Sequence, residues 1–200
     1  MASPTDLPIE PLLADICEAV RMRRRLVLAA PPGAGKTTRV PLALAGLIDG
    51  FKALPGKVVM LEPRRLAARM AAERMAATLG EKTGGRIGLA TRIERKVSKD
   101  TVVEVITDGL FTRRLLADPT LEGVSAVIFD EIHERSLNAD LGLALALETQ
   151  AVFRDDLHLI AMSATLDAAP VAACTVVPRR SRPRGRMEGL ASTPCGRARA

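Results

Sequence analysis

Two short stretches of the sequence carry residues that could bind and cleave a nucleoside triphosphate. Residues 33–38 read GAGKTT, and residues 127–135 read VIFDEIHER. In the first stretch, backbone N–H groups can converge on phosphate, Lys36 can reach its oxygens, and the Thr37 hydroxyl can hold Mg²⁺. In the second, Asp130 can hold the same ion while Glu131 positions and deprotonates the attacking water. Together they predict a phosphate site with a hydrolytic partner.

The surroundings of the first stretch fit a phosphate-binding loop. Residues 25–30 form an apolar run, residues 31–35 form a turn, and a helical pattern begins at Lys36. A side chain on either loop glycine would keep the backbone away from phosphate or forbid the required dihedral angles. The strict motif begins with Gly, and here Ala30 takes that place. The alternative is an ordinary glycine-rich turn between strand and helix. The predicted nucleotide contacts of this loop are Gly33, Ala34, Gly35, Lys36, Thr37 and Thr38.

These residues need a fold that brings distant segments together, and the chain shows the alternation of strands and helices that can form such a fold. Short, continuously apolar runs alternate with helical periodicity, which predicts an α/β fold with a mostly parallel sheet flanked by helices on both faces. The carboxyl ends of parallel strands meet at one edge of the sheet, so both stretches should face the same site. The predicted strands are 25–30, 57–62, 86–92, 101–107, 123–131 and 156–165, and the predicted helices are 9–22, 36–48, 64–80, 108–117 and 139–152.

Three further residues near strand ends could join this site. His133 follows Glu131 by two positions and could link the attacking water to a neighbouring strand. Ser163 and Thr165, in the tripeptide SAT, could bond to His133 or to the acidic pair. Each signal is weak by itself, because a lone histidine is commonly structural and many strand-to-loop turns contain Ser and Thr. His158, on an apolar strand, is expected in the core or on the surface.

The net charge of +6 is unevenly distributed. Residues 171–200 contain seven arginines and one acid, so residues 1–170 have a net charge of zero. We therefore expect a domain at 1–170 and a basic tail at 171–200 that is disordered, out of frame or artificially terminated. The alternative is a natural tail that touches RNA by charge. The arginines at 21–25 could form a nucleic-acid patch or a solvated helix end. With four Phe and no Tyr or Trp, a base-stacking platform is disfavoured.

The sequence also indicates the compartment. Cys17, Cys174 and Cys195 are isolated, which argues against a disulfide framework or a zinc site and favours a reducing environment. There is no apolar core of a signal peptide and no run of about 18–20 apolar residues that could span a membrane. We expect a cytoplasmic protein that does not contact membranes. Nothing in the sequence indicates an oligomeric state.

Five motifs occur in order over about residues 7–170: GAGKTT, LEPRRLAA, TDGLFTRRL, DEIHER and MSATL. This order resembles the DEAH/RHA group of superfamily 2 helicases, whose Asp-Glu-x-His box matches residues 130–133. The resemblance implies a RecA-like P-loop domain at 1–170 that uses ATP and Mg²⁺ and acts on nucleic acid, with RNA favoured over DNA. It implies that Glu131 is the general base and that Thr37 and Asp130 are Mg²⁺ partners.

The resemblance also implies roles outside the phosphate loop. It makes Arg64 and Arg65 one nucleic-acid motif and Thr107, Asp108 and Gly109 another, and it places Arg74 against the adenine. It makes Ser163 and Thr165 part of the motif that couples hydrolysis to unwinding. An arginine at a helix start can face a phosphate together with the helix's free N–H groups. The alternative for Arg64 and Arg65 is surface solubility.

One departure from the family pattern is large. Nothing after residue 170 resembles the second RecA-like domain, whose arginines complete the ATP site. We therefore expect a truncated helicase that by itself binds ATP weakly, hydrolyses it poorly and does not unwind. The alternatives are another P-loop NTPase, such as a kinase, or an inactive RNA-binding fragment.

Overall fold

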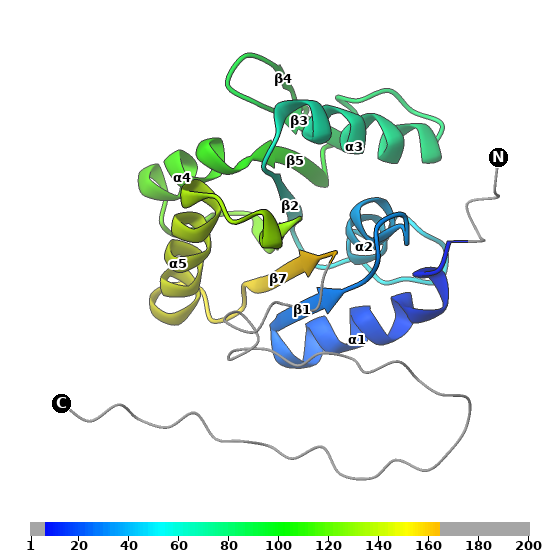
Figure 1. The fold of residues 1–200 in the computed structure, drawn as a ribbon, viewed down its shortest axis with the longest axis horizontal. Helices are drawn as coiled ribbons and strands as arrows, with labels where there is room; N and C mark the ends of the chain where they lie inside the picture. The colour runs from blue at the N-terminus through cyan, green and yellow to red at the C-terminus, as the bar shows by residue number, and fades with distance from the viewer. Residues whose placement is uncertain (1–6, 165–200) are drawn as a thin grey trace, which may run out of the picture.

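The computed structural model describes residues 7–164 of the 200-residue chain (Figure 1). The predicted tail at 171–200, the expected helical start at 166–173 and Thr165 lie outside the described residues. In chain order the helices and strands are η2 (Glu10–Leu12), α1 (Leu13–Arg23), β1 (Arg25–Ala29), α2 (Lys36–Leu44), β2 (Lys57–Glu62), α3 (Arg65–Thr78), β3 (Ile87–Ala90), β4 (Arg95–Lys96), β5 (Val103–Thr107), α4 (Asp108–Ala117), β6 (Val124–Phe129), η3 (Ile132–Glu134), α5 (Leu137–Val152) and β7 (His158–Ser163).

The strands form one sheet in the order β1-β7-β6-β2-β5-β3-β4. All neighbouring pairs are parallel except β3 and β4, which are antiparallel. This confirms the predicted mostly parallel sheet. Because β1, β2, β5, β6 and β7 run the same way, the segments that follow them meet at one edge of the sheet.

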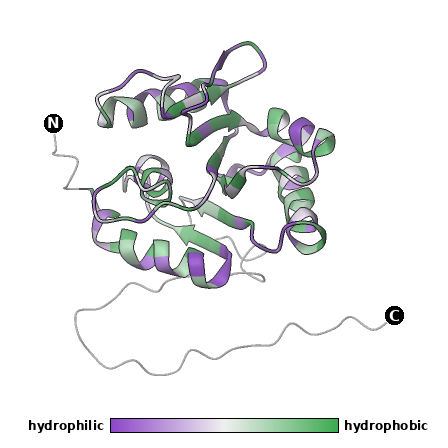
Figure 2. Cartoon of the chain, turned by 180° about the vertical axis from the view of Figure 1, so that it is seen from behind, coloured by the Kyte–Doolittle hydropathy of each residue, from purple (hydrophilic) through white to green (hydrophobic). Residues whose placement is uncertain are grey.

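Helices cover both faces of the sheet. Helices α1, α2 and α3 pack on one face, and α4 and α5 pack together on the other (Figure 1). In β1, Leu26 and Leu28 belong to the core under the first group, whereas Val27 belongs to the core under the second. This alternation explains why the strands are almost continuously hydrophobic (Figure 2) while the helices also carry hydrophilic residues.

The differences from the predicted elements have local causes. The first helix begins with the short 3-10 turn η2, where Pro11 takes an early helical position. The strand predicted at 86–92 ends at Ala90. Strand β4 was not predicted, because its two residues, Arg95 and Lys96, are charged and exposed. Helix α2 ends at Leu44 and not at residue 48.

Three of the four arginines at 21–25 contact other parts of the domain. Arg24 caps α1 in a left-handed conformation, with φ of 58°. The side chains of Arg21 and Arg24 donate to the backbone carbonyls of Lys52 and Asp155, and Arg25 donates to the side chain of Gln150. Arg21, Arg24 and Arg25 therefore bind parts of the domain next to the end of α1, and the choice between a nucleic-acid patch and a solvated helix end stays open. Across residues 7–164 we find no helix with the length and hydrophobicity needed to cross a membrane.

Candidate nucleotide-binding site

The loop between β1 and α2 has the backbone conformation that a phosphate loop needs. Gly33 and Gly35 have φ of 77° and 94°, a region that residues with a Cβ rarely adopt. The carbonyl of Gly35 accepts the N–H groups of Thr38 and Arg39 at 3.2 and 2.8 Å, which sets α2 in line with the loop. The first N–H groups of α2 therefore start at the loop, where the helix end carries partial positive charge.

The N-terminal segment supports this loop from outside, which the sequence did not indicate. The N–H of Ile9 donates to the carbonyl of Ala34 at 3.1 Å. A Cβ on Gly35 would lie 2.8 Å from Cδ1 of Leu7 and 3.2 Å from Cγ2 of Ile9. Glu10 and Arg39 form an ion pair next to these contacts. The second loop glycine is therefore required by close packing as well as by its dihedral angles.

The two stretches with catalytic residue types come together at the carboxyl edge of the sheet. Nζ of Lys36 lies 3.1 Å from Oε1 of Glu131, and the Thr37 hydroxyl donates to Oδ2 of Asp130 at 2.6 Å. The Lys36 side chain is only 4% exposed, so water and salt weaken the interactions of its charge only slightly. The sheet thus joins residues that are more than 90 positions apart in the sequence, as the parallel fold predicted.

A buried carboxyl group that the sequence analysis missed lies beside this pair. Glu62 ends β2, next to β6, and its side chain hydrogen bonds to Asp130. Burial and the nearby carboxylates raise the pKa of Glu62 to about 9. Burial also raises the pKa of Asp130, opposed by the Thr37 hydrogen bond. Both shifts favour one proton shared by the pair near neutral pH. The signal in the sequence was a charged residue that ends a buried strand.

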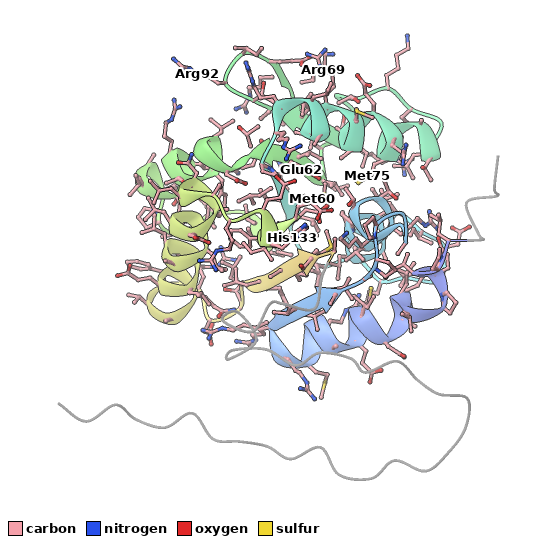
Figure 3. The ribbon with its side chains drawn as sticks, in the orientation of Figure 1. Met60, Glu62, Arg69, Met75, Arg92 and His133 are labelled. Atoms are coloured by element: carbon pink, nitrogen blue, oxygen red, sulfur yellow. The ribbon has the colours of Figure 1, made fainter. Side chains whose placement is uncertain are left out.

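His133 lies on the turn η3, directly after Glu131 (Figure 3). Its Nδ1 lies 3.2 Å from Oε2 of Glu131 and 3.4 Å from the backbone nitrogen of Ala164. One ring nitrogen cannot donate to Glu131 and accept from Ala164 at once, so these two contacts are alternatives that depend on the tautomer. His133 thus lies between Glu131 and the end of β7, and its predicted link to the attacking water stays a prediction.

The tripeptide SAT reaches this region through its backbone. The N–H of Ala164 lies 3.4 Å from Nδ1 of His133, and the hydroxyl contacts expected for Ser163 and Thr165 stay predictions. Ser163 is fully buried, and its carbonyl accepts the N–H of Ala30 at 3.1 Å. The end of β7 is therefore bound both to the start of the phosphate loop and to His133. His158, at the start of β7, is half-buried and its Nδ1 lies 3.0 Å from the carbonyl of Ser125, which fits the structural role expected for it.

The predicted nucleic-acid residues gather on the same edge of the sheet. Arg64 and Arg65 follow β2 at the start of α3, and both are exposed. Thr107 ends β5, and it pairs in register with Glu62. The two motifs are therefore neighbours. Asp108 differs from the rest because it is buried.

Asp108 acts inside the fold in this structure. Its Oδ2 accepts the Ser136 hydroxyl at 3.0 Å, and burial raises its pKa. Thr107 and Gly109, on either side of it, are partly exposed. The side chain of Asp108 is therefore bound inside the domain, and the nucleic-acid contact predicted for it stays a prediction. Arg74 is exposed on α3, and its predicted contact with adenine stays a prediction.

The residues present fit a Mg²⁺ ion. The Thr37 hydroxyl and the Asp130 carboxylate supply two oxygens at one point, and Mg²⁺ prefers oxygen ligands. Within the described part of the chain, no three His, Cys, Asp or Glu side chains are grouped as metal ligands. Mg²⁺ commonly takes its remaining ligands from substrate phosphates and water.

The fold and the residues at the carboxyl edge of the sheet define the class of the protein. A parallel sheet with a glycine-containing loop after β1, a Lys-Thr pair opening α2 and an Asp-Glu pair after β6 describes a RecA-like P-loop domain. The family model for DEAD/DEAH box helicases matches residues 11–173. The chain belongs to this family.

Several characterised relatives resemble the chain. It is 47% identical over 163 residues to the ATP-dependent RNA helicase HrpB of Escherichia coli (strain K12), and 40% identical over 164 residues to HrpA of the same strain. It is 38% identical over 154 residues to the DExH-box ATP-dependent RNA helicase DExH3 of Arabidopsis thaliana. These matches cover 82%, 82% and 76% of this chain but only 20%, 12% and 13% of the relatives.

A solved structure agrees with the sequence matches. The crystal structure of E. coli DEAH/RHA helicase HrpB superposes with a TM-score of 0.80 at 44% identity, over 86% of this chain and 22% of that one. This confirms the predicted RecA-like fold and the predicted family. The chain spans about a fifth or less of the relatives' length, so it corresponds to one domain of them.

Proposed function

We propose that this chain is the ATP-binding and ATP-hydrolysing domain of a nucleic-acid helicase, and that its nucleic acid is RNA. The observation that carries the proposal is the meeting of Lys36 with Glu131 and of Thr37 with Asp130 at one edge of the sheet. The relatives are named as ATP-dependent RNA helicases, which supports RNA over DNA. We also propose that residues 1–170 form this domain and that residues 171–200 are a separate basic tail.

The contacts suggest how the residues divide the work. Phosphate oxygens would take the Lys36 ammonium away from Glu131, because a polyphosphate carries more charge than one carboxylate. Glu131 would then keep its contact with His133 and be free to accept a proton from water. Asp130, fixed by Thr37 and Glu62, would hold Mg²⁺, which neutralises charge on the phosphates when bound.

The nucleic-acid side of the proposal rests on exposed groups. Arg64 and Arg65 can meet phosphates at the start of α3, and the partly exposed Thr107 and Gly109 lie beside them. Contacts of this kind bind the nucleic-acid backbone without reading its sequence. Ser163 and Thr165 would couple this edge to the ATP site. Arg74 would pack against the adenine.

The proposal is tested by separating ATP binding from hydrolysis. Lys36→Ala is expected to weaken the binding of a fluorescent ATP analogue with Mg²⁺. Glu131→Gln is expected to leave binding in place and to slow single-turnover hydrolysis, with saturating single-stranded RNA, by about 10²–10⁴-fold. Lys99→Ala and Glu122→Gln are matched controls, because both residues are exposed and lie outside the site. A wild-type chain that binds ATP no better than Lys36→Ala contradicts the proposal.

We also propose that the protein works in a reducing compartment such as the cytoplasm. Cys17 is a free, buried thiol on α1, and burial raises its pKa, which keeps it unreactive. The other two cysteines lie outside the described residues. Fractionation of cells that produce the protein would test this placement, and recovery of the protein in an extracytoplasmic fraction would contradict it.

A further inference from the structure

Glu134 is an acidic residue to which none of the motifs assigned a role. In the structure both of its carboxylate oxygens accept from Nη2 of Arg64, each at 3.1 Å. The Arg64 side chain is 73% exposed and the Glu134 side chain 34% exposed. The guanidinium proposed to meet a nucleic-acid phosphate is therefore already paired with a carboxylate that solvent reaches. Phosphate and carboxylate are equivalent partners for this group.

Glu134 lies on the turn that follows the proposed general base. Its N–H donates to the carbonyl of Glu131 at 2.9 Å, and His133 lies between the two. The turn is flanked by two non-glycine residues in the left-handed region, Glu131 with φ of 49° and Arg135 with φ of 47°. Such conformations persist only where surrounding contacts impose them. The contacts of this turn therefore determine how Glu131 is presented.

The remaining contacts of the segment lead into the domain. The Ser136 hydroxyl donates to the buried Asp108, in the second predicted nucleic-acid motif. Arg135 donates to Asp140 on α5, and Ile132 is buried in the core. The pair with Arg64 is different, because it joins the turn to the exposed start of α3. The segment that carries Glu131 is thus connected to both predicted nucleic-acid motifs.

We propose that Glu134 is a positioning residue that holds Arg64 until a nucleic-acid phosphate replaces its carboxylate. This exchange ties nucleic-acid binding to the turn that carries Glu131 and His133. The inference rests on the proposed function. An exposed ion pair shifts an equilibrium by at most about fivefold, so the pair orders Arg64 without preventing its exchange. A bound phosphate removes one restraint from the turn next to the ATP site.

The first experiment is a double-mutant cycle on RNA binding. The dissociation constant of a fluorescent single-stranded RNA is measured without nucleotide for the wild type, Glu134→Gln, Arg64→Gln and the double variant. Gln keeps the size of Glu134 and removes its charge. We expect Glu134→Gln to tighten binding about two- to fivefold when Arg64 is present, and clearly less in the Arg64→Gln background. Glu81→Gln is the control, since Glu81 pairs with Arg86 at the opposite edge of the sheet.

The second readout tests the connection to the turn. In Glu134→Gln the turn lacks its restraint even without RNA, so the ratio of RNA-saturated to RNA-free ATP hydrolysis should fall by at least about twofold. Glu134→Asp keeps the charge on a shorter side chain and should give intermediate values in both measurements. If Glu134 acted only in folding, its variants would change the midpoint of thermal unfolding. The RNA affinity and the stimulation ratio would then not follow the order wild type, Glu134→Asp, Glu134→Gln.

The outcomes separate this inference from the proposed function. RNA binding and stimulation by the wild type, with the same effect of Glu134→Gln whether or not Arg64 is present, would overturn the role of Glu134 and leave the proposed function standing. A wild-type chain that binds no RNA would overturn both. Tighter binding only in the presence of Arg64, together with a lower stimulation ratio, supports the exchange.

Discussion

Replacing Gly35 by Ala should destabilise the protein more than the same change at Gly33, although both glycines belong to one loop. Both have positive φ, at 94° and 77°. A new Cβ on Gly33 meets nothing within 4 Å. On Gly35 it would lie 2.8 Å from Cδ1 of Leu7 and 3.2 Å from both Cβ of Leu7 and Cγ2 of Ile9. Side-chain rotations can relieve the contacts with Cδ1 of Leu7 and Cγ2 of Ile9, whereas the contact with Cβ of Leu7 needs the segment to move.

The contacts give the expected size of the difference. A left-handed conformation costs an L residue about 1–2 kcal/mol, and the loss of chain entropy in the unfolded Ala variant returns about 0.4–1 kcal/mol. Gly33→Ala should therefore lower the free energy of unfolding by about 0–1.6 kcal/mol. Overpacking adds about 1–3 kcal/mol at Gly35. For a chain of this size, each kcal/mol corresponds to roughly 2–4 °C in the unfolding midpoint.

The assay is urea unfolding at 25 °C without nucleotide, so that changes in phosphate binding do not enter. Leu7→Ala provides the internal check, because it removes Cδ1 of Leu7, the atom that would lie 2.8 Å from the new Cβ. It should cost less stability in the Gly35→Ala background than in the wild type. Equal losses at Gly33 and Gly35, or no coupling between Leu7 and Gly35, would refute the account of the N-terminal segment as a support for the phosphate loop.

Two further predictions concern buried charge and a structural arginine. Since the pKa of Glu62 is raised from 4.5 to about 9 in the folded protein, the folded state keeps a proton that the unfolded state loses, and stability should fall as pH rises between these values. Glu62→Gln removes that dependence. In urea unfolding, the free energy of unfolding of this variant relative to wild type should therefore rise by on the order of 1 kcal/mol or more between pH 6 and pH 8.5. If the difference between variant and wild type is the same at both pH values, the shared proton is contradicted. Arg154 donates to the carbonyls of Thr120, Leu121 and Val124 at 2.9–3.0 Å. Arg154→Met should cost about 2–4 kcal/mol of unfolding free energy, against little for the exposed Arg113→Met, and similar values for both would contradict this role.

The sequence by itself determined the parts of the protein that depend on local pattern. Continuous apolar runs and helical periodicity predicted β2 and α4 with their observed bounds, and the residue order predicted the family. The phosphate loop could be predicted because its glycines are needed by the backbone conformation of the loop itself. Pairing of Lys36 with Glu131 followed from one general rule, that parallel strands bring their carboxyl ends together.

Only the tertiary structure decided the contacts that no local pattern encodes. In the sequence, Glu62 is only the last residue of a predicted strand. Its raised pKa depends on the packing of β2 beside β6, which buries it next to Asp130. The support of Gly35 by Leu7 and the pairing of Arg64 with Glu134 join segments whose spacing carries no signal. Periodicity reports which face of an element is buried, whereas a pKa or an ion pair depends on which side chains from other elements share that space. The motifs of the candidate site could therefore be found in the sequence, but the contacts and charges around them could not.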